Sequence, residues 1–128
     1  MRPRRARRSG TDRKLAAAWK HAVCGGARCA VCGAGGKLDG HHVISQQALR
    51  GFFVDLGFDH ETAERWRWDP RNGIALCERC HSRHELAVRR VPLYLLPHAV
   101  FAFVAELDAL FGDRQPVHAR LRRQYPEM

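Results

Sequence analysis

The apolar residues near the N-terminus recur at helical spacing. Leu15, Trp19 and either Ala22 or Val23 are three or four residues apart, so they share one face of a helix expected over residues 14–23. A glycine pair follows directly and ends this helix. The folded part of the chain is therefore expected to begin with a short amphipathic helix.

Two apolar stretches further along the chain have the length and composition of strands. Residues 37–44 are predicted to form one strand, and the run from Ile74 to Leu76 a second. Between them, residues 45–67 are expected to be helical or mixed, with Asp59 as the cap of a short helix. Residues 68–73 have the composition of a turn that leads into the second strand.

The most apolar segment follows Pro97 and ends at Gly112. Its large apolar side chains recur at helical spacing: Val100, Phe101, Phe103, Val104, Leu107, Leu110 and Phe111. We interpret it as a helix that closes the core. The alternative is a face for a second copy or a partner, because the helix is apolar over more than half of its girth.

The balance of charged residues predicts the kind of partner that the protein binds. Basic residues outnumber acidic ones by 22 to 13, and the formal net charge of +9 on 128 residues favours a polyanion, DNA above all. No apolar run approaches the roughly 20 residues that span a bilayer. The expectation is a cytoplasmic protein, cytosolic or associated with the nucleoid, with no membrane partner.

Basic residues are concentrated at the two ends of the sequence. Residues 1–14 are expected to form a flexible basic tail that either neutralises phosphates or only keeps the protein soluble. Residues 113–128 form a second basic tail and are another candidate for phosphate contact. Residues 15–112 then form the single domain.

Four of the five cysteines form two Cys-x-x-Cys pairs, Cys29 with Cys32 and Cys77 with Cys80. Four thiolates in this arrangement are typical of a closed tetrahedral zinc site. Cys24 remains and is expected to be a small, partly buried residue. The long gap between the two pairs means that the zinc ion clamps the ends of a larger unit.

A histidine group belongs to the same unit. Joining the cysteine pairs brings His41 and His42 next to the helix that carries His81 and His84. Adjacent side chains of a strand point to opposite faces, so His41 and His42 divide into one metal ligand and one base. The alternative is that these histidines only support the zinc site.

These residues carry a family resemblance. Residues 39–45 (DGHHVIS), then Asn72, then residues 77–81 (CERCH) resemble the HNH endonucleases, in the subgroup whose ββα-metal motif is braced by a four-cysteine zinc. The resemblance covers residues 29–85, about half of the chain. It implies an α+β fold: a small zinc-stabilised ββα-metal (His-Me finger) domain with flanking helices.

The resemblance also implies roles for individual residues. His41 matches a ligand of the catalytic metal ion, His42 the general base, and His81 a second ligand. Asn72 matches the residue that tethers the loop and orients the base, although in some members it binds the metal ion.

The helix that begins near Cys80 departs from the family pattern at one position. Members with a further histidine often place it four residues after the first, where this chain has Glu85, whereas His84 lies one residue short. Which of the two approaches the ion stays open. Arg79 and Arg83 flank the site and either hold DNA phosphates or are ordinary surface charges.

The implied reaction is hydrolysis of DNA phosphodiester bonds, giving 5′-phosphate and 3′-hydroxyl ends. An imidazole that is neutral near pH 7 suits the base, and a divalent ion (Mg²⁺, Mn²⁺, Ni²⁺ or Zn²⁺) suits the developing negative charge. A monomer would nick one strand, and a homodimer could cut both. A phage packaging protein or another DNA-processing protein is a candidate partner.

Two other functions compete with a nuclease. One is a zinc-stapled DNA-binding module without catalysis, which would not require the set of His42, Asn72 and His81. The other is a protein-interaction domain whose partner docks on the helix after Pro97.

Overall fold

The computed structural model describes residues 10–82 and 92–125. The N-terminal nine residues, Arg83, His84 and the expected end of their helix lie outside the described residues. The elements in chain order are α1 (Gly10–Cys24), β1 (Leu38–His42), α2 (Gln46–Asp55), α3 (His60–Arg67), β2 (Gly73–Cys77), α4 (Glu78–Ser82), η1 (Leu93–Leu95), α6 (His98–Phe111), η2 (Gly112–Arg114) and α7 (Val117–Gln124). In this part of the chain, no helix is long and apolar enough to cross a membrane.

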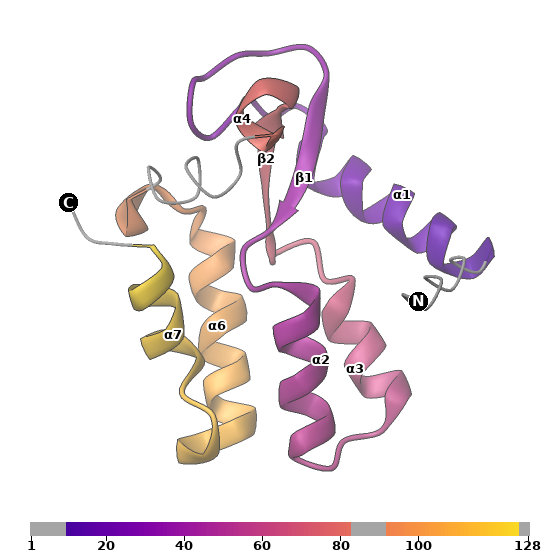
Figure 1. Ribbon diagram of the computed structural model, residues 1–128, viewed down its shortest axis with the longest axis vertical. Helices are drawn as coiled ribbons and strands as arrows, with labels where there is room; N and C mark the ends of the chain where they lie inside the picture. Colours follow the sequence, from indigo (N-terminus) through magenta and orange to yellow (C-terminus); the bar gives the residue numbers. More distant parts are fainter. Residues whose placement is uncertain (1–9, 83–91, 126–128) are drawn as a thin grey trace, which may run out of the picture.

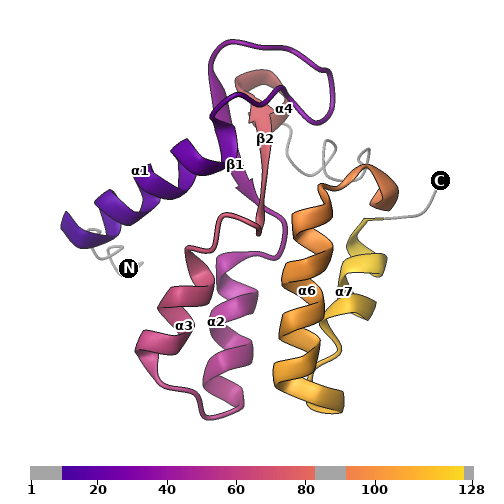
Figure 2. The same ribbon diagram turned by 180° about the vertical axis from the view of Figure 1, so that it is seen from behind.

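The two strands form one antiparallel sheet in which Leu38 lies opposite Cys77 and His42 opposite Gly73. The chain between them leaves the sheet and forms the helical pair α2 and α3, which extends away from the strands (Figures 1 and 2). Helix α4 begins directly where β2 ends. The two strands and α4 make a ββα unit, and the expected α+β fold is confirmed.

Local capping explains where the helices begin and end. The Ser45 side chain accepts a hydrogen bond from the Ala48 amide at 3.1 Å, and Asp59 accepts one from the Thr62 amide at 2.8 Å, as expected of N-caps. Hydrogen bonds from Thr62 lower the pKa of Asp59. Helix α6 ends at Gly112, whose φ of 62° suits glycine, as predicted. Helix α1 begins at Gly10, earlier than the sequence predicted.

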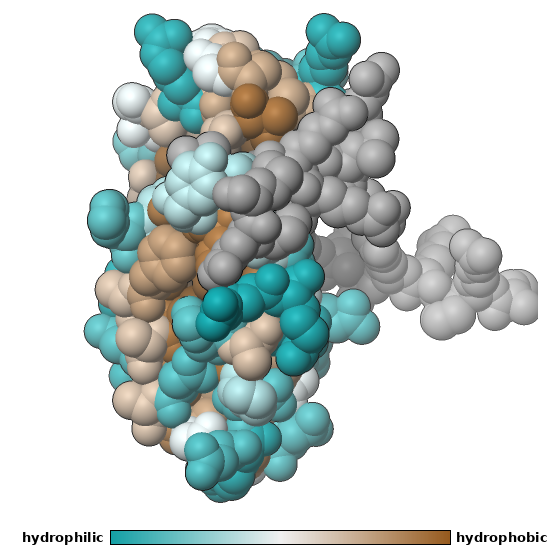
Figure 3. Space-filling view, turned by 90° about the vertical axis from the view of Figure 1, so that its left-hand side faces the viewer, coloured by the Kyte–Doolittle hydropathy of each residue, from teal (hydrophilic) through white to brown (hydrophobic). Residues whose placement is uncertain are grey.

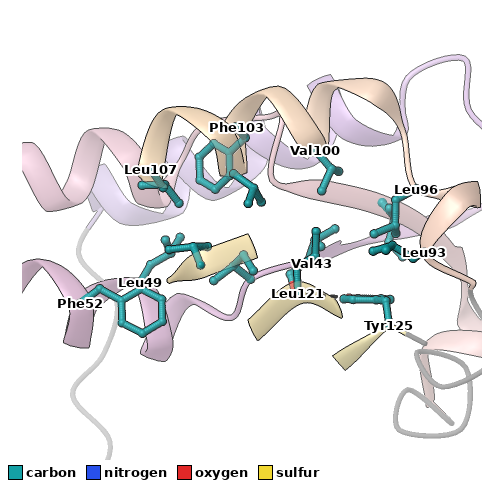
Figure 4. Close-up of a cluster of buried hydrophobic side chains, with 14 of the residues drawn as sticks. Val43, Leu49, Phe52, Leu93, Leu96, Val100, Phe103, Leu107, Leu121 and Tyr125 are labelled. Atoms are coloured by element: carbon teal, nitrogen blue, oxygen red, sulfur yellow. Dashed lines mark hydrogen bonds between the residues drawn. The ribbon is translucent and has the colours of Figure 1, made fainter. Parts of the chain in front are cut away.

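The core lies between α2, α6 and α7 (Figure 4). Val100, Phe103 and Leu107 of α6 are fully buried. Leu107 lies on the side of Leu49 from α2, and Val100 on the side of Val43. The apolar face of α6 is therefore used within the chain. This weakens the alternative in which that face binds a partner.

The C-terminal segment differs from the basic tail that the sequence suggested. Residues 117–124 form helix α7, in which Val117, Leu121 and the following Tyr125 are buried. These three residues are spaced four apart, so one face of α7 is apolar although the helix is rich in arginine. The Tyr125 hydroxyl donates to the Val43 carbonyl at 3.3 Å, and burial raises its pKa.

The other face of α7 carries His118, Arg122 and Arg123, which are exposed. Viewed from the side of α7, hydrophilic side chains occupy much of the surface (Figure 3). Arg120 is an exception because its guanidinium group lies over the Phe52 ring, 5.4 Å from the centroid. This segment is thus a packed helix with one buried apolar face and basic residues on its exposed face.

Helix α1 packs on both strands through Trp19, which is buried. Gly40 and Gly73 leave room for it: a Cβ atom at Gly40 would lie 2.5 Å from Trp19 Cζ3, and one at Gly73 2.8 Å from Trp19 Cζ2. The Trp19 indole also donates to the Asp69 carbonyl at 3.1 Å. Two glycines on paired strands are therefore required for α1 to dock.

Gly40→Ala is expected to lower the free energy of unfolding by about 1–3 kcal/mol, because the new methyl group overlaps the Trp19 ring. Gly51→Ala is the matched control. Gly51 lies inside α2, and a Cβ atom there would meet nothing within 4 Å, so alanine should stabilise the protein by about 0.5–1 kcal/mol. Urea unfolding followed by tryptophan fluorescence measures both, and equal stabilities of the two variants would contradict the docking role of Gly40.

Candidate functional site

Both Cys-x-x-Cys pairs meet at one end of the sheet. Cys29 and Cys32 lie in the turn between α1 and β1, Cys77 ends β2, and Cys80 lies in α4. Their four Sγ atoms all lie within 4.8 Å of one another. The Cys32 and Cys77 Sγ atoms are 3.7 Å apart, close to the ~3.8 Å edge of a tetrahedron with 2.3 Å zinc–sulfur bonds. The predicted cluster is confirmed and could hold a structural metal ion.

Backbone amides support this cluster. Burial raises the pKa of the Cys29 thiol, but hydrogen bonds from the backbone of Cys32, Cys77 and Val31 outweigh it and lower the pKa to about 6. The Cys80 thiol, hydrogen-bonded to Cys77, has a pKa raised to about 12. One thiolate is thus favoured by the protein itself, and a bound cation would allow its neighbours to ionise as well.

His41 and His81 lie together on one face of β1. Their ring centroids are 6.2 Å apart in an edge-to-face arrangement. Asp39, two residues before His41 and therefore on the same face, has a carboxylate oxygen 3.2 Å from His81 Nδ1. A carboxylate accepts, so Nδ1 donates and the lone pair of neutral His81 lies on Nε2. A carboxylate behind a histidine is a common support for a metal ligand.

The histidine pair fits a metal ion by its chemistry, but it is not a complete ligand set. In residues 10–82 and 92–125, the four cysteines are the one group of three or more donor side chains close enough to share an ion. His84, the tentative third histidine ligand, and Glu85 lie outside the described residues.

His42 lies on the opposite face of β1 and is held between aromatic rings. It stacks on Trp19 with centroids 3.8 Å apart and an interplanar angle of 2°, and Trp68 meets it edge-on at 6.1 Å. Its Nε2 atom lies 3.3 Å from the Arg67 carbonyl oxygen. The division of His41 and His42 between two faces is as the sequence predicted.

Asn72 is completely buried and links the two strands near His42. Its Oδ1 accepts from the Ile44 amide at 2.7 Å, and its Nδ2 donates to the Ile44 carbonyl at 2.9 Å. This pair of hydrogen bonds fixes the chain that leaves β1 against the turn that enters β2. Both the oxygen and the nitrogen of the buried Asn72 side chain are hydrogen-bonded, so this residue has a structural role here.

An open pocket of about 210 Å³ lies beside these groups and is lined by both His42 and His81. Lys20 of α1 also lines it, with its ammonium group 3.6 Å from Asp39. Arg79 is exposed on α4, whereas Arg83 lies outside the described residues. The pocket is therefore bounded by α1, β1 and α4 together.

Several residues of the pocket were not identified from the sequence: Trp19, Lys20, Asp39, Gln46 and Trp68. The sequence does contain a signal for Asp39, because a residue two positions before His41 lies on the same face of the strand. It contains no signal that places Trp19 and Lys20 at the pocket, since their position depends on how α1 docks.

Fold and site together define a small ββα domain with a cysteine cluster that could bind metal and histidines around a pocket. Residues 29–87 match the model of a family described as HNH endonuclease. The resemblance found in the sequence is thereby confirmed, and it indicates a nuclease-type function. No curated protein and no solved structure matched the chain. Helices α1, α6 and α7 lie outside the matched residues.

Proposed function

We propose that the chain is a metal-dependent DNA endonuclease or nickase in which His42 is the general base. One observation carries this proposal: His42 on one face of β1 and His81, backed by Asp39, both line a single pocket. A base and a candidate metal ligand on one pocket are what hydrolysis of a phosphodiester requires.

Two different metal sites are proposed. Cys29, Cys32, Cys77 and Cys80 would hold a structural Zn²⁺ ion, for which four thiolates are the usual ligands. His41 and His81, with His84 as a tentative third ligand, would hold the catalytic ion. When bound, that ion supplies Lewis-acid stabilisation of the negative charge on the phosphate and on the leaving oxygen. Imidazole ligands favour Mn²⁺, Ni²⁺ or Zn²⁺ over Mg²⁺.

His42 would remove a proton from the attacking water. The Arg67 carbonyl only accepts hydrogen bonds, so neutral His42 donates through Nε2 and keeps its lone pair on Nδ1. Nδ1 takes the proton as the water oxygen bonds to phosphorus, the bond from phosphorus to the 3′ oxygen breaks, and that oxygen takes a proton from solvent water. The products are a 5′-phosphate and a 3′-hydroxyl. Asn72 would keep the strand end that carries His42 in place through Ile44.

Positive charge would bring the DNA to this pocket. The net charge of +9 provides general attraction. Arg79 and Arg83, next to the candidate site in sequence, would hold phosphates near the cleaved bond. A monomer offers one pocket and would nick one strand, whereas a homodimer could cut both. A cytoplasmic role with a phage packaging or other DNA-processing protein is consistent with this chemistry.

The second candidate is a DNA-binding module stapled by zinc that has lost catalysis. The cysteine cluster and the positive charge serve both functions equally. The stacking of His42 between Trp19 and Trp68 and its position on the pocket favour the nuclease, because DNA binding alone does not require a fixed imidazole there.

The purified protein is expected to convert supercoiled plasmid into nicked or linear DNA when Mg²⁺, Mn²⁺, Ni²⁺ or Zn²⁺ is supplied, and not when EDTA is in excess. Gel electrophoresis over time measures the products, and the ratio of nicked to linear DNA reports how many strands each encounter breaks. DNA binding without cleavage under every ion would favour the second candidate.

A further inference from the structure

A closed ring of hydrogen bonds surrounds the imidazole of His42. Arg67 Nε donates to Gln46 Oε1 at 2.7 Å, and Gln46 Nε2 lies 3.4 Å from His42 Nδ1. His42 Nε2 lies 3.3 Å from the carbonyl oxygen of Arg67. Arg67 thus begins and ends the ring, through its side chain and its backbone. We propose that Gln46 and Arg67 are positioning residues that fix the tautomer of His42, an inference that rests on the proposed function.

The direction of each hydrogen bond follows from which groups can donate. A guanidinium group only donates, so the atom of Gln46 that faces Arg67 must be the carbonyl oxygen. The amide nitrogen of Gln46 then faces His42 and donates, which requires Nδ1 to accept. The Arg67 carbonyl only accepts, which requires Nε2 to carry the proton. Both ends of the ring therefore select the same neutral tautomer.

The surrounding structure holds both positioning residues in place. The Arg67 guanidinium contacts a Glu64 carboxylate oxygen at 3.1 Å and lies 4.5 Å from the centroid of the Trp68 ring. Gln46 is the first residue of α2 and follows the Ser45 cap, so its backbone position is set by the start of the helix. The ring is thus built on the ends of two helices.

This tautomer is the one that the proposed reaction needs. It leaves the Nδ1 lone pair in the pocket lined by Gln46 and His42. The contact of 3.4 Å from Gln46 is long for a hydrogen bond, so a water molecule can replace it at Nδ1 when DNA binds. The other tautomer would place a proton at the atom that must accept one.

Gln46→Glu tests the inference with a change of one functional group. The carboxylate keeps the Arg67 contact but can only accept, so it draws a proton onto His42 Nδ1. We expect the imidazole ¹⁵N shifts of His42, assigned with His42→Ala, to show a proton on Nε2 alone in the wild type and on both nitrogens in Gln46→Glu, because the Arg67 carbonyl still faces Nε2. We also expect cleavage to fall by about 100-fold or more, the usual contribution of a general base.

Gln47→Glu is the matched control. Gln47 is exposed and lies in the same first turn of α2, so its replacement by Glu adds the same charge there as Gln46→Glu does. Gln47→Glu should keep the wild-type tautomer of His42. Its DNA affinity shows how much the added negative charge alone changes DNA binding, and the result for Gln46→Glu is corrected by that amount. A proton on Nδ1 in the wild type, or unchanged shifts and cleavage in Gln46→Glu, would overturn the inference.

The outcome stays decisive if Gln46→Glu does not fold. Gln46→Leu then removes the amide, and a drop in turnover of roughly tenfold at unchanged DNA affinity would support the inference, whereas a wild-type turnover would overturn it. If the wild type cleaves no DNA, the proposed function fails, but the ¹⁵N spectra still decide whether Gln46 sets the tautomer.

Discussion

His42→Ala is expected to reduce plasmid cleavage by about 10²–10⁴-fold, to the level of the background reaction, because it removes the group that takes the proton from water. Folding and metal content should persist, since the cysteine cluster is formed by other residues and Asn72 still links Ile44 to the turn before β2. Initial rates of nicking, the melting temperature and elemental analysis measure these three properties.

His60→Ala provides the comparison for this variant. His60 is exposed at the start of α3 and does not line the pocket of His42, so its loss should leave the rate of nicking unchanged. Equal activity of wild type, His42→Ala and His60→Ala would point to a contaminating nuclease or to a different base.

Cys77→Ala is expected to leave the protein unfolded or insoluble. Structural zinc contributes an apparent binding free energy of roughly 10–16 kcal/mol, as much as the roughly 5–15 kcal/mol by which whole domains are stable. Cys77 also accepts the Cys80 amide and lies 3.7 Å from the Cys32 sulfur, so its loss removes one corner of the cluster. Circular dichroism and elemental analysis test this, and a strong chelator should have the same effect on the wild type.

Cys24→Ala is the matched control because Cys24 lies outside the cluster. Burial raises the pKa of its thiol, which therefore stays protonated and packs as a small apolar group. The variant should keep one zinc ion per chain and lose at most about 1 kcal/mol. A soluble Cys77→Ala protein with an unchanged melting temperature would show that no metal ion braces the fold.

The parts of the fold that the sequence predicted correctly are those with a local signal. The spacing within each Cys-x-x-Cys pair, the glycine after α6 and the Asp59 cap depend on residues close together in the chain. The strands were also predicted, because each is short and bounded by turn residues. Boundaries were less exact, as the earlier start of α1 shows.

The parts that were missed depend on contacts between distant segments. Nothing local indicates that Trp19 stacks on His42, or that Gln46 meets an arginine 21 residues further on. Helix α7 was missed for another reason. Its arginines dominate the composition, although the spacing of Val117, Leu121 and Tyr125 already indicated a buried face.

The long segment that connects β1 to β2 has a consequence for the order of folding. The strands are joined by 30 residues that form α2 and α3 instead of a tight hairpin turn, so no local event brings His42 opposite Gly73. Closing such a loop costs chain entropy before any strand contact forms, and an isolated two-stranded sheet is barely stable. We expect the helical pair to form first and metal capture to complete the pairing, so the candidate site would assemble only in the last step of folding.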